Sequence, residues 1–582
     1  MGREIFDRKG PRKAWGAMVL AALLILLPGA GLSGCSSAKA QLPGGALKEW
    51  TGWLTGGDAG EDRQAGKIGQ TEENGQSGET GQSGETGQAG KAGQSGETGQ
   101  SGKAGQAGET GQAGKTRQSG ETGQSGKAGQ AAEAGQAEGR AAAAGSQAAG
   151  GKEGEARQQE EADRKGGTTG EVFTWNRHFP KGVRLPKAYD YREEGRAPQI
   201  GNQGSLGTCW AFASLTALSS SLLPGETAVF SVDHMSMRNN FLLDQDEGGE
   251  YTMSMAYLLG WQGPVWESED PYGDGISPDG LKPRKHVQEI QILPPKDYEA
   301  IKEAVYLVGG VQSSLYTSMK DYQSESVYYN RETNSYCYVG SEKPNHDSVI
   351  VGWDDGYPKE NFNMELEGDG AFICTNSWGE DFGEQGYFYV SYYDTNIGVN
   401  NIVYTEVDPV DNYSRMYQSD LCGWIGQIGY GEDEAWFANA FQTEKEERLM
   451  AAGFYATDRD TEYEIYVARH LPKSGGDSAE KALKSRILAA KGTLQYAGYY
   501  TVPLGEKILL EDGEKFAIIV KIMTPGTVHP VAIEYDAGDG IAQVDLTDGE
   551  GYLSYDGSIW ENVERTQNCN VCLKAYTRDK DG

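Results

Sequence analysis

Apolar and polar residues are distributed very unevenly along this chain of 582 residues. An apolar run covers residues 14–27, and a polar stretch rich in glycine, alanine and glutamate then continues to about Thr169. Apolar residues return near Val172, where ordered structure is expected to begin. The folded part is therefore predicted to be the C-terminal part of the chain, behind a long segment that has almost nothing to bury.

Helix and strand patterns occur at several places in this folded part. The apolar pattern of residues 210–218 predicts a helix with Cys209 at its start, and residues 346–353 are typical of a strand that begins at His346. In the last third, β-like segments alternate with Asp-Gly turns; they are residues 464–468, 516–521 and 531–535. Short strands with regular turns predict an all-β sandwich, which we place at residues 413–578.

The polar stretch contains a repeat with glycine at every third position. Glycine holds these positions from residue 75 to residue 129 except at Arg117, and the pattern fades by residue 135. Residues 36–171 are therefore predicted to form a low-complexity tether, for which two states compete. A flexible linker needs no apolar residues, whereas a trimeric collagen-like stalk needs glycine at its axis. Because the repeat contains no proline, we predict that residues 75–130 are disordered and monomeric.

The first 35 residues have the pattern of a targeting signal. Basic residues precede the apolar run of residues 14–27, which is short for a transmembrane helix and typical of a secretory signal. The tetrapeptide LSGC, ending at Cys35, follows and resembles the lipobox of bacterial lipoproteins. This resemblance implies a lipidated Cys35 and an extracytoplasmic, membrane-anchored protein at the cell surface. Plain secretion and an uncleaved anchor are the alternatives.

Composition excludes several functional classes. A formal net charge of −33 argues against a nucleic-acid binder, which would need a basic surface. Seven cysteines are too few for a disulfide scaffold in a secreted chain of this length. Cys569 and Cys572 form a lone pair, either a local disulfide or two thiols, because zinc would need two more ligands. No metal and no cofactor are expected.

Three motifs in the folded part carry candidate chemistry. The first is IGNQGSLGTCWAFA, with Gln203 six residues before Cys209 at the predicted helix start, where a thiolate is favoured. The second is NHDSVIVGW, which places His346 137 residues after the cysteine. The third is AFICTNSWG, with Asn376 and Trp378, followed by a glycine-rich turn. This order of cysteine, histidine and asparagine suits nucleophilic catalysis.

Together these motifs resemble the papain family of cysteine proteases. The resemblance implies an α+β fold, with a helical lobe and a β-barrel-like lobe, over residues 172–405. It implies Cys209 as nucleophile, His346 as base, Asn376 as the residue that orients the histidine, and Trp378 as a shield for their hydrogen bond. Gln203 and the backbone N–H of Cys209 would form the oxyanion hole.

The resemblance also implies a substrate-binding segment, and the sequence departs from the family pattern at two points. Gly248 and Gly249 lie where papain-like enzymes carry a Gly-Gly strand that pairs with an extended peptide. Leu206 stands where such enzymes usually have a disulfide-bonded cysteine, so that bond is expected to be absent. No helical propeptide is recognisable before Val172, which puts the usual activation in doubt.

The last third adds a second resemblance. The segments around Tyr430, Trp436 and Phe454 are similar to the lectin-like domain that follows some bacterial papain-type proteases. A carbohydrate ligand and a contact with a surface protein are both open for this domain.

The whole sequence thus implies a surface-tethered cysteine endopeptidase that acts on protein or peptide substrates. Two rivals are a non-catalytic surface adhesin and a peptidoglycan amidohydrolase on a related fold. The intact site argues against the first, and the contexts of Gln203, Asn376 and Trp378 argue against the second.

Overall fold

The computed structural model describes residues 25–26, 172–472, 481–538, 540–547 and 549–581. Of the predicted signal peptide only β1 (Ile25–Leu26) is described, as a two-residue strand beside β12 (Gly426–Ile428). The predicted lipidation site at Cys35 and the tether of residues 36–171 lie outside the described residues. Within those residues, no helix is both long and apolar enough to cross a membrane.

The first folded domain, residues 185–408, combines helices and a sheet. Its helices are α2 (Cys209–Leu222), α3 (Val232–Met237), α4 (Tyr251–Leu259), α5 (Tyr298–Leu307) and the 3-10 turn η1 (Lys359–Asn361). Its strands are β2 (Ala188–Asp190), β3 (His286–Ile292), β4 (Val311–Leu315), β5 (Tyr329–Asn330), β6 (Ser335–Tyr336), β7 (His346–Asp354), β8 (Ala371–Thr375), β9 (Tyr387–Ser391) and β10 (Asn401–Asp408).

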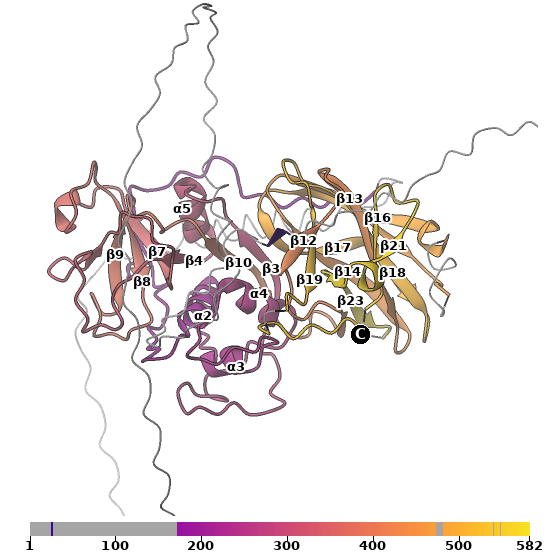
Figure 1. The fold of residues 1–582 in the computed structure, drawn as a ribbon, viewed down its shortest axis with the longest axis horizontal. Coiled ribbons are helices and arrows are strands. Elements are labelled where there is room, and N and C mark those ends of the chain that lie inside the picture. Colours follow the sequence, from indigo (N-terminus) through magenta and orange to yellow (C-terminus); the bar gives the residue numbers. More distant parts are fainter. Residues whose placement is uncertain (1–24, 27–171, 473–480, 539, 548, 582) are drawn as a thin grey trace, which may run out of the picture. The chain divides into compact units, whose positions relative to one another are not determined.

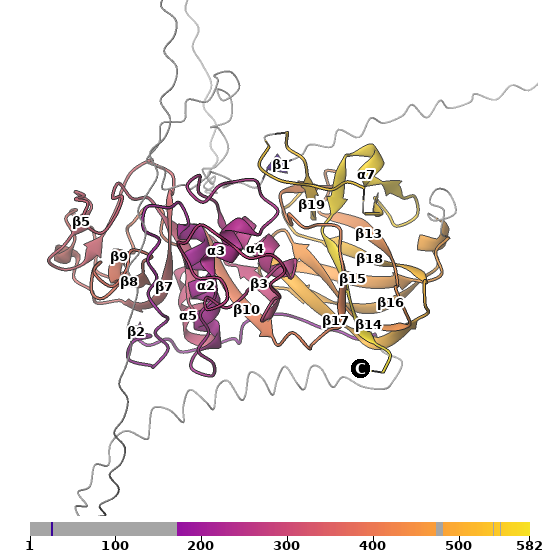
Figure 2. The same ribbon diagram turned by 90° about the horizontal axis from the view of Figure 1, so that it is seen from below.

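These elements form two lobes, as predicted. Figures 1 and 2 show α2, α3 and α4 gathered beside β3 and β10, whereas β7, β8 and β9 lie in the other lobe. Helix α2 is the central helix of the domain, and it buries ten of its 14 residues. A helix that is apolar or small on nearly every face needs such an enclosed position. The predicted helix and strand begin at Cys209 and His346 as expected, and they extend beyond the predicted segments to Leu222 and Asp354.

The second folded domain, residues 413–579, is the predicted β-sandwich. Its elements are β11 (Arg415–Tyr417), β12, β13 (Glu434–Gln442), β14 (Glu447–Ala456), β15 (Thr461–Ala468), β16 (Arg486–Leu494), β17 (Ala497–Leu510), β18 (Lys515–Met523), β19 (Val531–Tyr535), β20 (Gly551–Ser554), β21 (Glu561–Asn562), α7 (Val563–Thr566), β22 (Cys569–Val571) and β23 (Leu573–Asp579). Strands β15, β18 and β19 contain the three segments expected from the sequence. Inward-facing residues such as Phe437, Phe454 and Ile465 form its buried core.

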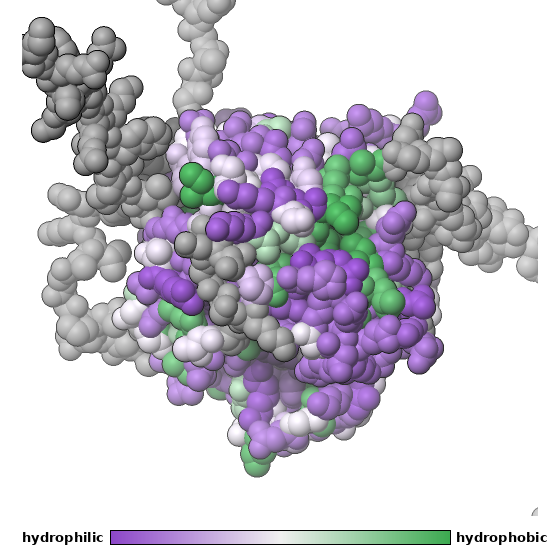
Figure 3. All heavy atoms as spheres, turned by 90° about the vertical axis from the view of Figure 1, so that its right-hand side faces the viewer, coloured by the Kyte–Doolittle hydropathy of each residue, from purple (hydrophilic) through white to green (hydrophobic). Residues whose placement is uncertain are grey.

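The surface of the sandwich domain is mostly hydrophilic but carries apolar side chains. Figure 3 views the molecule from the side on which this domain lies in Figure 1 and shows apolar residues among polar ones. Ile487, Tyr555 and Ile559 are among the exposed apolar residues of the domain. Exposed apolar side chains suit both expected ligand classes, carbohydrate and protein, so they do not distinguish between the two.

The two domains share one sheet, which the sequence did not predict. Strand β17 of the sandwich pairs antiparallel with β3 of the first domain, with Tyr499 opposite Ile290. The Thr501 hydroxyl also donates to the side-chain oxygen of Gln288 at 2.8 Å. The sheet therefore runs from β11 through β17, β3 and β7 to β5. Separating the domains would expose two unpaired strand edges, which would be open to pairing with other chains.

Residues 172–179 add a second connection between the domains. Thr174 and Arg177 form parallel bridges to Lys491 and Leu494 of β16, and Trp175 is buried in the sandwich core. Arg177 also pairs with Glu289 of β3 at 2.8 Å. The segment before the first domain is thus anchored on the second.

Candidate active site

Cys209 lies at the N-terminus of a buried helix. It is the first residue of α2 and is fully buried. The preceding residue, Thr208, does not cap the helix, because its hydroxyl instead bonds the Tyr272 hydroxyl at 2.6 Å. The first backbone N–H groups of α2 therefore have no side-chain cap from this residue. The positive end of a helix dipole favours the thiolate form of a cysteine placed there.

His346 and Asn376 are held together by neighbouring strands. His346 begins β7, and Asn376 directly follows β8, which pairs antiparallel with β7. The Nε2 atom of His346 lies 2.8 Å from the Oδ1 atom of Asn376. An amide oxygen only accepts, so Nε2 carries the hydrogen and Nδ1 is the nitrogen that can exchange a proton. The N–H of Ser377 donates to the same oxygen at 2.8 Å and fixes the amide.

Trp378 covers this histidine–asparagine pair. Its ring centroid is 4.9 Å from that of His346, at an interplanar angle of 33°, and only 3% of the residue is exposed. Phe382 packs edge-on against the indole, with the ring centroids 5.0 Å apart. Excluding water strengthens a hydrogen bond of this kind. The position agrees with the shielding expected from the sequence, whereas a direct contact of Trp378 with substrate stays a prediction.

Gln203 links the cysteine loop to the asparagine loop. Its Oε1 atom accepts from the Ser377 hydroxyl at 2.6 Å, and its backbone N–H donates to the Ser377 carbonyl at 2.8 Å. One hydrogen of its side-chain amide goes to the Leu206 carbonyl at 2.7 Å. The amide carries a second hydrogen, so Gln203 is a fixed donor beside the start of α2.

The glycine pair Gly248 and Gly249 packs against the cysteine loop. A side chain on Gly207 would come within 2.8 Å of the Gly248 nitrogen, and one on Gly249 within 2.5 Å of the Trp210 indole nitrogen. These close approaches require glycine. The expected regular strand is not formed here, because Gly248 has a φ of +91° and α4 begins at Tyr251. Peptide binding by this backbone stays a prediction.

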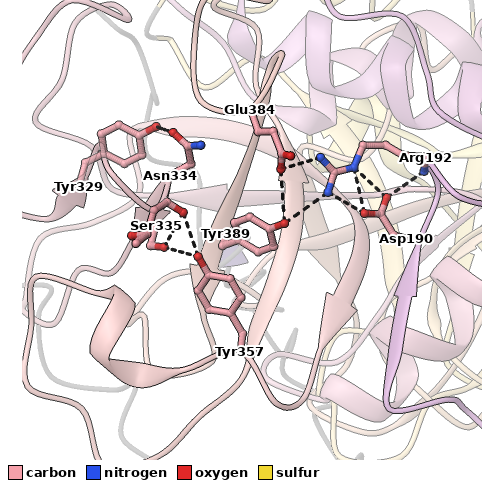
Figure 4. Close-up of polar contacts among 9 residues, drawn as sticks. Asp190, Arg192, Tyr329, Asn334, Ser335, Tyr357, Glu384 and Tyr389 are labelled. Atoms are coloured by element: carbon pink, nitrogen blue, oxygen red, sulfur yellow. Dashed lines mark hydrogen bonds and ion pairs between the residues drawn. The ribbon is translucent and has the colours of Figure 1, made fainter.

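A polar network that sequence reasoning missed supports the asparagine loop. Arg192 pairs with Asp190 at 2.6 Å and with Glu384 at 2.9 Å, and these residues appear together in Figure 4. Glu384 belongs to the glycine-rich turn whose Gly386 carbonyl accepts from the Asn376 N–H at 3.0 Å. The ion pair thus fixes the turn on which Asn376 rests. No local motif could reveal it, since 192 residues separate Arg192 from Glu384.

Other described cysteines are poor nucleophiles. Burial raises the pKa of Cys337 to about 12 and that of Cys569 to about 12, and it also raises the pKa of Cys374. These groups are neutral thiols near pH 7. Cys569 and Cys572 are both buried and are not joined to each other.

One group of side chains in the described part of the chain has metal-ligand spacing, namely His470, Glu511 and Glu514. The Glu514 carboxylate is already held by Arg469 at 2.7 Å. That pairing leaves no argument for a cation there.

Comparisons with known proteins agree with this geometry. Residues 185–407 match the model of the papain family of cysteine proteases, residues 416–577 match the lectin-like domain, and residues 55–116 match the collagen triple helix repeat. The collagen match falls on the tether, whose physical state stays a prediction.

Curated relatives align with about a third of this chain. Cathepsin K of Mus musculus is 28% identical over 211 residues, covering 35% of this chain and 59% of the relative. Cathepsin S of Bos taurus is 29% identical over 213 residues, which also cover 35% of this chain and 59% of the relative. The chain thus spans about three fifths of the length of these relatives.

Solved structures match both domains. The cysteine protease and lectin-like domains of Cwp84, a surface layer associated protein of Clostridium difficile, align with a TM-score of 0.59 and 25% identity over 73% of this chain and 96% of that one. Clostridial Cwp84 after propeptide cleavage aligns with a TM-score of 0.58 and 26% identity. This alignment covers 68% of this chain and 99% of that one. Residues 185–407 therefore form a papain-family cysteine protease domain, and residues 416–577 form the lectin-like domain that follows it.

Proposed function

We propose that this protein is a papain-type cysteine endopeptidase held at the bacterial cell surface. The observation that carries the proposal is the hydrogen bond of 2.8 Å between His346 and Asn376, in the lobe opposite the helix that begins at Cys209. A nucleophile at a helix N-terminus and a histidine oriented by a third group are the two parts that nucleophilic acyl transfer needs.

Each residue has a defined task in this reaction. The Cys209 thiolate attacks a peptide carbonyl, and protonated His346 passes its proton to the leaving amine as the bond to nitrogen breaks. Water, deprotonated by His346, then hydrolyses the thioester and releases Cys209. The Gln203 amide and the Cys209 N–H stabilise the oxyanion in both steps. Asn376 keeps the imidazole in position, and Trp378 excludes water from their hydrogen bond.

To test this proposal, the full chain is incubated with a diverse peptide library, and the cleavage products are identified by mass spectrometry. Internal cleavage at many peptides is expected. Release of single terminal residues alone would contradict an endopeptidase. Binding without any cleavage would favour the adhesin, and cleavage confined to peptidoglycan peptides would favour the amidohydrolase.

The surface location rests on the predicted signal and on the neighbours. Cwp84 is described as a surface layer associated protein, which supports an extracytoplasmic location here. We propose that lipid on Cys35 holds the chain to the membrane and that residues 36–171 separate the enzyme from it. The lectin-like domain would then contact carbohydrate or a surface protein.

Replacing Cys35 with alanine is expected to remove lipid from the protein and to release it from the membrane, because stable attachment needs acyl chains that only this residue would carry. Metabolic labelling with a fatty acid, followed by membrane fractionation, measures the effect. Ser37→Ala serves as the matched control and should stay in the membrane fraction. Unchanged labelling of the Cys35→Ala protein would contradict the anchor.

A further inference from the structure

Residues 240–247 connect α3 to the glycine pair of the first domain. Phe241 and Leu243 pack, partly buried, against the core of that domain, whereas Leu242 between them is 59% exposed. This alternation is typical of an extended segment. The backbone N–H and C=O groups of such a segment need hydrogen-bond partners along its edges.

The second domain supplies partners for this segment. Residues 541–543, in the loop between β19 and β20, form an antiparallel bridge with it. The N–H of Leu242 donates to the carbonyl of Ile541 at 2.7 Å. The N–H of Gln543 donates to the carbonyl of Asn240 at 2.9 Å. The two domains are therefore also joined near the glycine pair, apart from the pairing of β17 with β3.

The same segment is held at its other end by the cysteine loop. The carbonyl of Gln245 accepts from the N–H of Gly207 at 2.8 Å, and Gly207 in turn packs closely against Gly248. The side-chain amide of Gln245 donates to Asp233 of α3 at 2.7 Å. Displacing residues 240–243 would disturb the glycine pair, because the chain between them is short and closely packed.

The loop that supplies the bridge is fixed inside the second domain by buried polar groups. The thiol of Cys422 donates to the carbonyl of Gln543 at 3.6 Å, and the N–H of Cys422 donates to the Glu534 carboxylate at 2.7 Å. The buried amide of Asn570 donates to Glu534 and to the carbonyl of Asp545, each at 2.8 Å. Buried hydrogen bonds of this kind stiffen the segments that they join.

We propose that residues 541–543 of the lectin-like domain position Gly248 and Gly249, so that the second domain contributes to peptide binding in the first. A backbone that pairs with an extended peptide binds it better when its donors and acceptors are already held in place. The loop touches none of the reacting atoms, so its residues are positioning residues. This proposal rests on the proposed peptidase function.

The test compares two substitutions at one position. Gln543→Pro removes the N–H that donates to Asn240, whereas Gln543→Ala keeps it and replaces only an exposed side chain. The full chain of each variant is treated with two reagents, and mass spectrometry of the Cys209 peptide gives both rate constants of modification. Iodoacetamide reacts with the thiolate directly, whereas a peptidyl epoxide must also bind along the glycine pair.

The ratio of the epoxide rate to the iodoacetamide rate is expected to fall at least about tenfold for Gln543→Pro, because misplaced binding groups reduce reactivity by this order or more. For Gln543→Ala the ratio should stay at the wild-type value. Leu242→Pro and Leu242→Ala form a second pair, which removes or keeps the other hydrogen bond of the bridge. The same contrast is expected there.

An unchanged ratio in a folded proline variant would overturn the positioning role. A parallel fall of both rates would do so too, because it indicates loss of the whole site. Unfolding of both proline variants in circular dichroism would also count against the proposal, since a contact that only positions the glycine pair is not needed for folding. If neither reagent modifies Cys209 in the wild type, the peptidase proposal itself fails.

Discussion

Cys209→Ala is expected to lower kcat/KM for peptide cleavage by at least about 10³-fold. The thiolate is the atom that bonds to substrate, and alanine leaves nothing at the start of α2 that can replace it. The methyl side chain is smaller than the thiol, so the buried helix N-terminus should keep its structure. Initial rates on a fluorogenic peptide measure the loss, and circular dichroism measures the fold.

Cys337→Ala is the matched control, because Cys337 is also fully buried but its pKa is raised to about 12. Its activity should stay close to that of the wild type. A peptidyl-epoxide reagent should label Cys209 and no other described cysteine, which peptide mapping would detect. Labelling of Cys337 or Cys374 with Cys209 untouched would refute the assignment.

His346→Ala is expected to lower kcat/KM by about 10³- to 10⁴-fold, whereas Asn376→Ala should lower it by about 10- to 100-fold. The imidazole moves the proton in both half-reactions, while the asparagine only holds it through the hydrogen bond of 2.8 Å. Steady-state kinetics on one peptide substrate give both numbers.

The pH profile separates positioning from a general loss of structure. Without Asn376 the imidazole of His346 can still transfer a proton, but it loses the hydrogen bond that orients it. The pH profile of kcat/KM for Asn376→Ala should therefore shift along the pH axis. Asn363→Ala, a partly exposed asparagine that donates to the Tyr329 carbonyl, is the control and should keep the wild-type profile. Equal and negligible losses for His346→Ala and Asn376→Ala would count against the proposed site.

Local patterns were sufficient for much of this protein. The apolar spacing after Cys209 predicted α2 and its first residue, and the run from His346 predicted β7, because each is decided by neighbouring residues within one element. The strands of the sandwich followed from the same kind of pattern. Motif spacing indicated Gln203 and Asn376, since a catalytic site uses a few residue types in a fixed order.

Only the tertiary structure decided how distant segments meet. The pairing of β17 with β3, the hold of Arg192 on Glu384 and the bond from Ser377 to Gln203 each join residues that no local pattern relates. Chain order alone does not determine which polar groups share a buried space, because that depends on the packing of whole elements against each other.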